Sequence, residues 1–219
     1  MPAPEAAQPS RGQIAVAQRR LERLLEEHGL LLVHDAKLPS ATACIAGAPV
    51  PGSWWGHAQG KLIYEVLERL EDTVAWAKLV LGKDTLVQRR LWPALVAAAE
   101  SGQAWQTTGL KADAKRLLAR IRRGGPVRTD GAPAATGRKL GAIATELERR
   151  LLAHGRSEHT ASGHHARFLE TWGAWGRARG IAASTLPDAA DAITALSAPV
   201  LAWTGGLRPA GLLPWPGGG

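Results

Sequence analysis

Acidic and histidine side chains that could carry acid–base chemistry gather at residues 158–165, in the run EHTASGHH. Glu158, His159 and His164 are the candidate catalytic residues of this block. A carboxylate next to an imidazole fixes the ring tautomer and raises its pKa, which suits general acid–base catalysis. Three histidines and a glutamate can also bind zinc, although this spacing matches no established metal motif. A catalytic or metal site, a contact with nucleic acid, and a solvated turn all stay open for this block.

Two adjacent tryptophans and a histidine stand between glycines at residues 52–57, in the run GSWWGH. We expect one of Trp54 and Trp55 to be buried and the other to present a face, because neighbouring indoles do not readily point the same way. An exposed indole beside His57 could stack on a nucleobase, with His57 as a further catalytic candidate. Alternatively, both tryptophans fill a domain junction, and His57 bonds to the backbone at a helix start.

Paired arginines occur at the end of a predicted strand, in the run RRLWPAL. Side chains of adjacent strand residues face opposite sides. Only one of Arg89 and Arg90 can therefore meet a phosphate on a given face, while the other pairs with a carboxylate.

The charge balance favours an anionic partner. The chain has 27 Lys and Arg residues against 19 Asp and Glu, a net charge of +8, with a pI near 10.4. Arginine accounts for 20 of the 27 cations. This excess partly reflects codon usage in a GC-rich bacterial genome, but the planar guanidinium also pairs with phosphate. We expect DNA as the partner, with phosphate contacts from Arg116, Arg120, Arg122, Arg123 and Arg138 and hairpin contacts from Arg156, His164 and Arg167.

Several common function classes lack their signatures here. The sequence has no phosphate-binding glycine loop, no dinucleotide fingerprint and no nucleophile elbow. We predict no cofactor and no metal. The one cysteine, Cys44, lies in an apolar run and is expected to be a small buried residue in a reducing compartment. With neither a signal peptide nor a membrane span expected, the predicted location is the cytoplasm.

The spacing of apolar residues predicts a mainly helical α+β fold with two β-hairpins. Helices are expected at 12–28, after Ser40, and at 61–71, 92–101, 110–123, 138–150, 171–179 and 187–196. A short strand is expected at 30–33. The first hairpin joins 74–80 to 85–89, and the second joins 151–160 to 164–169 through a turn at 161–163. A continuous helix over 163–178 is the competing interpretation.

The chain order suggests two similar halves, each with a helix that leads into a hairpin. A winged helix combines these parts, so we expect tandem winged-helix-like modules at 11–123 and 137–200, with a generic α+β domain as the alternative. Residues 1–10 are expected to be a disordered leader, residues 124–136 a linker or flexible loop, and residues 201–219 an irregular tail.

The blocks GSWWGH, RRLWPAL and EHTxSGxH resemble those of an uncharacterised bacterial protein family of about this length. That resemblance covers most of residues 12–175 and implies no activity. More distantly, the architecture is similar to that of bacterial DNA glycosylases built from tandem winged helices. Their Gln-x-Gln catalytic pattern is absent, since Gln59, Gln103 and Gln106 do not have that spacing.

These features together predict a DNA-binding protein of bacterial DNA repair or regulation. Two alternatives stay open: an enzyme with a His/Glu site, either glycosylase-like or a metal-dependent hydrolase, and a Trp-rich protein-interaction module.

Overall fold

The computed structural model describes residues 8–129, 139–159, 165–206 and 211–216. The chain forms two compact units. The first comprises residues 1–75 and 84–90, and the second comprises residues 76–83 and 91–219. The domain boundaries expected from the sequence stay a prediction.

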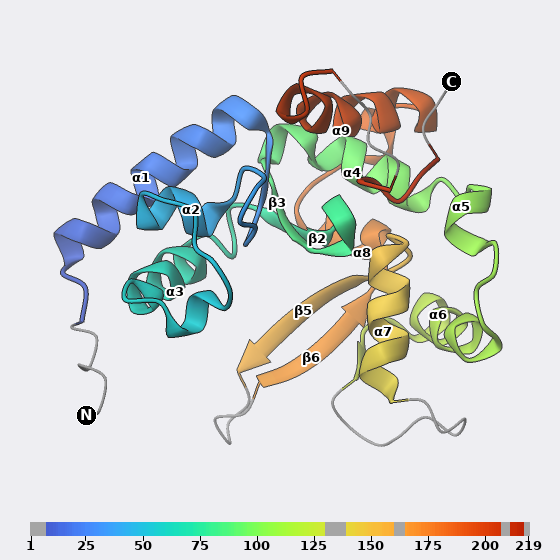
Figure 1. Ribbon diagram of the computed structural model, residues 1–219. Coiled ribbons are helices and arrows are strands. Elements are labelled where there is room, and N and C mark those ends of the chain that lie inside the picture. The colour runs from blue at the N-terminus through green and yellow to red at the C-terminus, as the bar shows by residue number, and fades with distance from the viewer. Residues whose placement is uncertain (1–7, 130–138, 160–164, 207–210, 217–219) are drawn as a thin grey trace. The chain divides into compact units, whose positions relative to one another are not determined.

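Helices dominate the first unit (Figure 1). Its elements, in chain order, are α1 (Arg11–His28), β1 (Leu30–Leu32), α2 (Ala41–Ala46), the 3-10 helix Trp54–Gly56, α3 (Gly60–Arg69) and β3 (Asp84–Val87), with the 3-10 helix Arg89–Leu91 after it. The three α-helices pack against one another. Strand β2 (Ala75–Lys78) follows α3, and the 3-10 helix Val80–Gly82 lies between β2 and β3.

Local sequence explains where α1 begins and ends. The Ser10 hydroxyl accepts a hydrogen bond from the backbone N–H of Gln13, and the Gln13 side chain accepts one from the N–H of Ser10. This reciprocal capping box satisfies two donors that a helix start leaves open. Gly29 ends the helix at a positive φ of 77°, where a side chain would be strained. The predicted helix at 12–28 is confirmed.

Strand β1 and helix α2 also follow the prediction. All three residues of β1 are buried, and Leu31 lies opposite Leu86 of β3 in antiparallel register. Ser40 caps α2, because its hydroxyl accepts a hydrogen bond from the N–H of Ala43.

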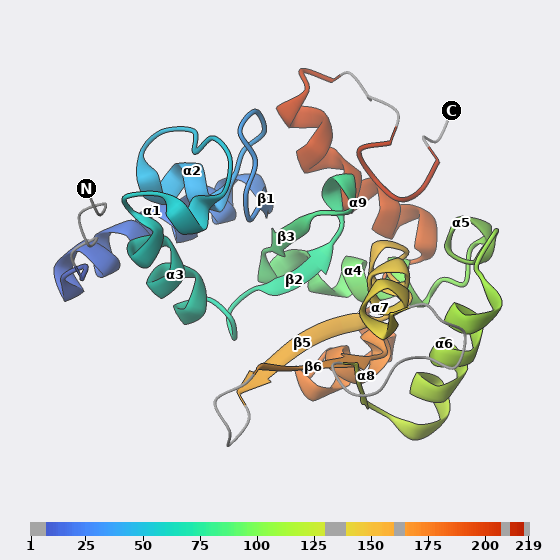
Figure 2. The ribbon, with the colours of Figure 1, turned by 60° about the horizontal axis from the view of Figure 1, so that its bottom comes forward.

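The second unit holds most of the remaining elements (Figure 2). They are α4 (Trp92–Glu100), α5 (Ala104–Thr107), α6 (Ala112–Gly124), β4 (Val127–Arg128), α7 (Leu140–Arg149), β5 (His154–His159), β6 (His165–Glu170), α8 (Trp172–Ala178), the 3-10 helix Ala183–Thr185 and α9 (Ala189–Trp203). Helix α4 packs on α8 and α9, while α6 packs on α7, β4 and β6.

The strands form two small three-stranded antiparallel sheets, ordered β1-β3-β2 and β4-β6-β5. In each sheet, the strand that comes first in the chain pairs with the third, and the second and third form a hairpin. The expected mainly helical α+β fold with two hairpins is confirmed. The competing helix over 163–178 is wrong, because residues 165–170 form β6 and a helix begins only at Trp172.

A polar network joins α5 to the end of α7. Arg150 donates from Nη1 to the backbone carbonyls of Trp105, Gln106 and Thr108, at 3.3, 3.2 and 2.7 Å. These carbonyls lie at the end of α5, where a helix leaves acceptors open. The Gln106 side chain is fully buried and donates to the carbonyl of Ala99 at 2.7 Å.

The C-terminal part differs from expectation. The helix predicted at 187–196 continues to Trp203, with Pro199 inside it. In the segment expected to be an irregular tail, Trp215 is buried, and its indole N–H donates to the hydroxyl of Ser197 at 3.1 Å. A large apolar ring with one donor gains from such a half-polar site, which explains the order at this residue.

The segment expected to be a linker also contains a strand, since Val127 and Arg128 pair with Leu169 and Phe168 of β6. Residues 130–138 and most of the leader lie outside the described part. Among the described residues, no helix has the length and apolar content to cross a membrane.

Candidate nucleic-acid interface

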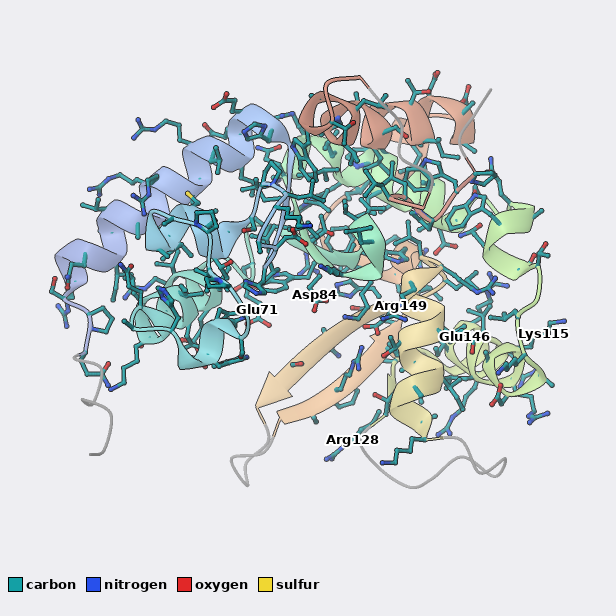
Figure 3. The ribbon with its side chains drawn as sticks, viewed as in Figure 1. Glu71, Asp84, Lys115, Arg128, Glu146 and Arg149 are labelled. Carbon is teal, nitrogen blue, oxygen red and sulfur yellow. The ribbon has the colours of Figure 1, made fainter. Side chains whose placement is uncertain are left out.

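Helix α6 has one apolar face and one cationic face. Its buried residues are Ala114, Leu117, Leu118 and Ile121, whose spacing of three and four places them on one side of a helix. That side belongs to the apolar core of the second unit, which also includes Ile143 and Leu169. The opposite side is therefore free to carry charge. Figure 3 labels Lys115 on α6 and Glu146 on α7, the helix on which α6 packs.

Six cations occupy the exposed side of α6 and its N-cap position. All are solvent exposed: Lys111, Lys115, Arg116, Arg120, Arg122 and Arg123. Asp113 is the one acidic residue of this stretch, so residues 111–123 carry six positive charges and one negative, a net +5. Two carboxylates of the second unit, Glu148 and Glu170, pair with residues outside α6. Like charges so close together repel, so a bound anion relieves this repulsion.

The arginines of the second hairpin have carboxylate partners. Nε of Arg156 lies 3.6 Å from Oε1 of Glu170, and its guanidinium lies 5.1 Å from the ring centre of Phe168. Arg167 pairs with the carboxylate of Glu148, which is 7% exposed. These partners reduce the charge that the hairpin can offer to a phosphate. Arg138 lies outside the described residues.

A histidine that the sequence reasoning missed lies at the base of the second hairpin. His154 is 6% exposed, and its Nδ1 lies 3.3 Å from Oε1 of Glu170 on the opposite strand. Its ring packs against Trp172 and Trp175, whose ring centres lie 4.8 and 5.5 Å from the centre of the His154 ring. The predicted hairpin turn at 161–163 already implied that residues 154 and 170 face each other, so their complementary chemistry was the available signal.

The surroundings of Glu170 favour its charged form. Burial by itself raises the pKa of this carboxyl. The hydrogen bond with His154 and the positive charges nearby outweigh burial, so the pKa of Glu170 lies below its ordinary value. The arrangement is a carboxylate–imidazole pair whose imidazole packs against two tryptophan rings, and it stabilises the junction of β5, β6 and α8.

The predicted catalytic block is only partly described. Glu158 and His159 belong to β5, but their side chains and the whole of His164 lie outside the described part. His57 belongs to the first unit, and its Nδ1 accepts a hydrogen bond from the backbone N–H of Gln59 at 3.2 Å, just before α3 begins. This contact is the one expected if His57 has a structural role. Among the described residues, no group of three His, Cys, Asp or Glu side chains could hold a metal ion.

The tryptophan block forms an exposed aromatic cluster. The expectation that Trp54 and Trp55 point apart is wrong: their ring centres lie 4.0 Å apart with planes 24° from parallel. The tight turn of the 3-10 helix brings the indoles together, and Gly60 allows it, because a Cβ there would lie 3.0 Å from both tryptophan carbonyl oxygens. Trp55 is 66% exposed and also contacts Tyr64 at 5.9 Å between ring centres.

The arginine pair after β3 is not in strand geometry. Arg89 and Arg90 lie in a 3-10 helix, so the argument from alternating strand faces is wrong for them. Arg90 donates to the backbone carbonyl of Glu26 at the end of α1, where helix carbonyls lack partners. Cys44, expected to be buried, is half-buried, and burial raises the pKa of its thiol.

Comparisons of the chain with protein-family models, with curated proteins and with solved structures find no match.

Proposed function

We propose that this protein binds DNA through the cationic face of α6. The observation that carries the proposal is the set of six solvent-exposed cations on residues 111–123, against a single acidic residue in that stretch. Phosphate contacts from Lys and Arg supply most of the affinity of sequence-independent DNA binding. Arginine, which makes up four of the six, also matches the geometry of a phosphate.

The repeated order of elements supports a tandem winged-helix-like architecture. The first series is α1-β1-α2-α3-β2-β3, and the second is α6-β4-α7-β5-β6. Both series form a sheet in which the first strand pairs with the third, as expected of a winged helix. The second series has no described counterpart of α2, since residues 130–138 lie outside the described part. Fold alone does not assign function, so the charge of α6 carries the argument.

The proposed setting is bacterial DNA repair or regulation in the cytoplasm. A single cysteine fits a reducing compartment. The enzyme alternative, with His57, Glu158, His159 and His164 as its candidate residues, stays a prediction. The role of Trp54 and Trp55 as base-stacking residues stays a prediction.

A matched pair of charge-reversed variants tests the proposal. Binding of fluorescent duplex and single-stranded DNA is measured by anisotropy at low and high salt. The test variant replaces Arg120, Arg122 and Arg123 by glutamate, and the control makes the same replacement at the exposed Arg11, Arg19 and Arg23 of α1. We expect salt-sensitive binding by the native protein and the control, and its loss in the α6 variant.

Two results would contradict DNA binding through α6. One is the absence of binding to either DNA at low salt. The other is equal loss of affinity in the two variants, because both change the net charge of the chain by the same amount and only the position differs.

A further inference from the structure

The six cations of α6 fall into two rows along the helix. At 100° per residue, one row lies about 130° around the helix axis from the other. The first row contains Arg116, Arg120 and Arg123. The second row contains Lys111, Lys115 and Arg122. The ends of the first row are about seven positions apart, and the ends of the second row are about eleven positions apart. At a rise of about 1.5 Å per residue, the rows extend about 10 and 16 Å along the axis.

A narrow strip of small residues separates the rows. Ala112 and Ala119 lie near the line midway between them, and both are at least partly exposed. Because these side chains are so short, the solvent-facing side of α6 has two raised cationic edges and a low apolar centre. The buried residues lie on the opposite side of α6, which packs on α7, β4 and β6.

We propose that α6 lies in the major groove of a B-form duplex, with each row facing the phosphates of one strand. This inference rests on the proposed DNA binding. The groove is about 12 Å wide and admits a helix of about 10–12 Å diameter. Each strand carries one phosphate per about 3.4 Å of duplex axis, so a row of three cations matches the phosphates along one edge.

The occupant is a duplex rather than a single strand. A single strand engages one row and leaves the other without a partner. Stacking on unpaired bases needs aromatic side chains, and α6 has none. Double-stranded RNA fits less well, because its major groove is too deep and narrow for protein side chains to enter.

The strip of alanines makes this binding independent of base sequence. Base reading in the major groove relies mostly on hydrogen bonds from arginine, lysine, asparagine or glutamine side chains, and an alanine can contact only the methyl group of thymine. Ala112 and Ala119 offer only methyl groups to the groove floor. The arginines lie at the edges, where the phosphates are, so their contacts position the helix without specifying sequence.

The first experiment compares the rows. One variant replaces Arg116, Arg120 and Arg123 by glutamine, and its partner replaces Lys111, Lys115 and Arg122. We expect each to lower the slope of log affinity against log salt by about 2 to 3, since each lost phosphate contact removes about 0.9. Unchanged urea unfolding checks that both variants fold. A change in slope for one row alone would overturn the two-strand geometry.

The second experiment tests the groove with modified duplexes and the native protein. Bulky glucosylated cytosines fill the major groove, and we expect them to weaken binding by at least about tenfold, or about 1.4 kcal/mol. A ligand that fills the minor groove should leave affinity unchanged, as should replacement of guanine by 7-deazaguanine, which removes a major-groove acceptor.

The outcomes separate this inference from the proposed function. Duplex binding that depends on α6 but ignores the glucosylated cytosines overturns the groove placement and leaves DNA binding intact. Loss of affinity with 7-deazaguanine overturns sequence independence. Absence of binding to any nucleic acid at low salt, or binding only to anionic lipid vesicles, overturns both.

Discussion

In the first sheet, Leu31 faces Leu86 and all of β1 is buried, whereas the second sheet combines buried apolar residues with charged pairs. There, Glu170 bonds to His154 across the β5–β6 pair, and Arg167 pairs with Glu148 of α7. The same strand order thus accommodates an apolar cross-strand pair in one sheet, and in the other a carboxylate–imidazole pair together with an ion pair to a neighbouring helix. Topology does not dictate the chemistry that stabilises it.

The first helices of the two series also differ in net charge. Residues 11–28 of α1 carry four arginines and three glutamates, a net +1, while residues 111–123 carry a net +5. On α3, the negative charge of Glu68 raises the pKa of Tyr64, which reports an electronegative surface. On the proposal of DNA binding, a phosphate would be attracted more strongly to α6 than to α3. This contrast between two similar series is the reason why the proposed interface lies on α6.

The largest expected effect is a loss of stability when a buried leucine is removed from either sheet. Leu86 and Leu169 are both fully buried, so Leu86→Ala and Leu169→Ala should each lower the free energy of unfolding by about 2–5 kcal/mol. Urea unfolding measures the total, and hydrogen exchange of amides in each sheet assigns the loss to one sheet. A loss of unfolding free energy below about 1 kcal/mol at either residue would contradict the idea that both sheets depend on buried apolar side chains.

Gly155→Ala tests the ionic part of the second sheet. A Cβ at this position would overlap the carboxylate of Glu148, which pairs with Arg167. We expect a loss of about 1–3 kcal/mol, because the carboxylate has to leave its place in a packed site. Gly124→Ala, where an added Cβ meets no atom within 4 Å, is the control. Equal unfolding midpoints for the two variants would contradict this account.

Glu170→Gln gives a pH-dependent effect. The pKa of Glu170 is lower in the folded than in the unfolded protein. Its stabilisation is therefore present above the ordinary glutamate pKa and is lost as the pH falls through the lowered pKa. We expect a loss of about 1–2 kcal/mol near neutral pH that shrinks toward zero in acid. Urea unfolding across pH measures it, with the exposed Glu27→Gln as control, and a difference that persists in acid would exclude the charge as its cause.

The smallest effect concerns the charges of α6 themselves. Arg116→Gln combined with Arg123→Gln should change the free energy of unfolding by less than about 0.5 kcal/mol, because both side chains are exposed. A slight gain is favoured, since removing like charges relieves repulsion. Thermal and urea unfolding measure the change. A loss above about 1 kcal/mol would mean that these arginines support the fold rather than bind a partner.

Much of the fold was predictable because its signals are local. The apolar spacing of α1, the cap at Ser40 and the glycine at position 29 act within a few residues of each other. The extension of α9 past Pro199 was not predictable in this way, because the buried Trp215 that packs near it comes from a distant part of the chain.

The candidate site shows the same division. The cationic character of α6 is visible in the sequence, since the helix and its charges are local. The ion pairs of Arg156 and Arg167 are not visible in the sequence, because the positions of their partners Glu170 and Glu148 depend on strand register and on packing against α7. The stacking of Trp54 on Trp55 depended on a 3-10 turn that apolar spacing does not encode.

That stacked pair gives the first unit an optical label of its own. Trp55 is open to water, so a dissolved quencher such as acrylamide reaches its excited indole, while Trp172 and Trp175 of the second unit are shielded. Two indoles in such close contact also couple their electronic transitions, which produces a circular dichroism signal that vanishes when the turn unfolds. Loss of the stacked-pair signal therefore reports the unfolding of the turn at Trp54–Gly56, without a dye or an engineered residue.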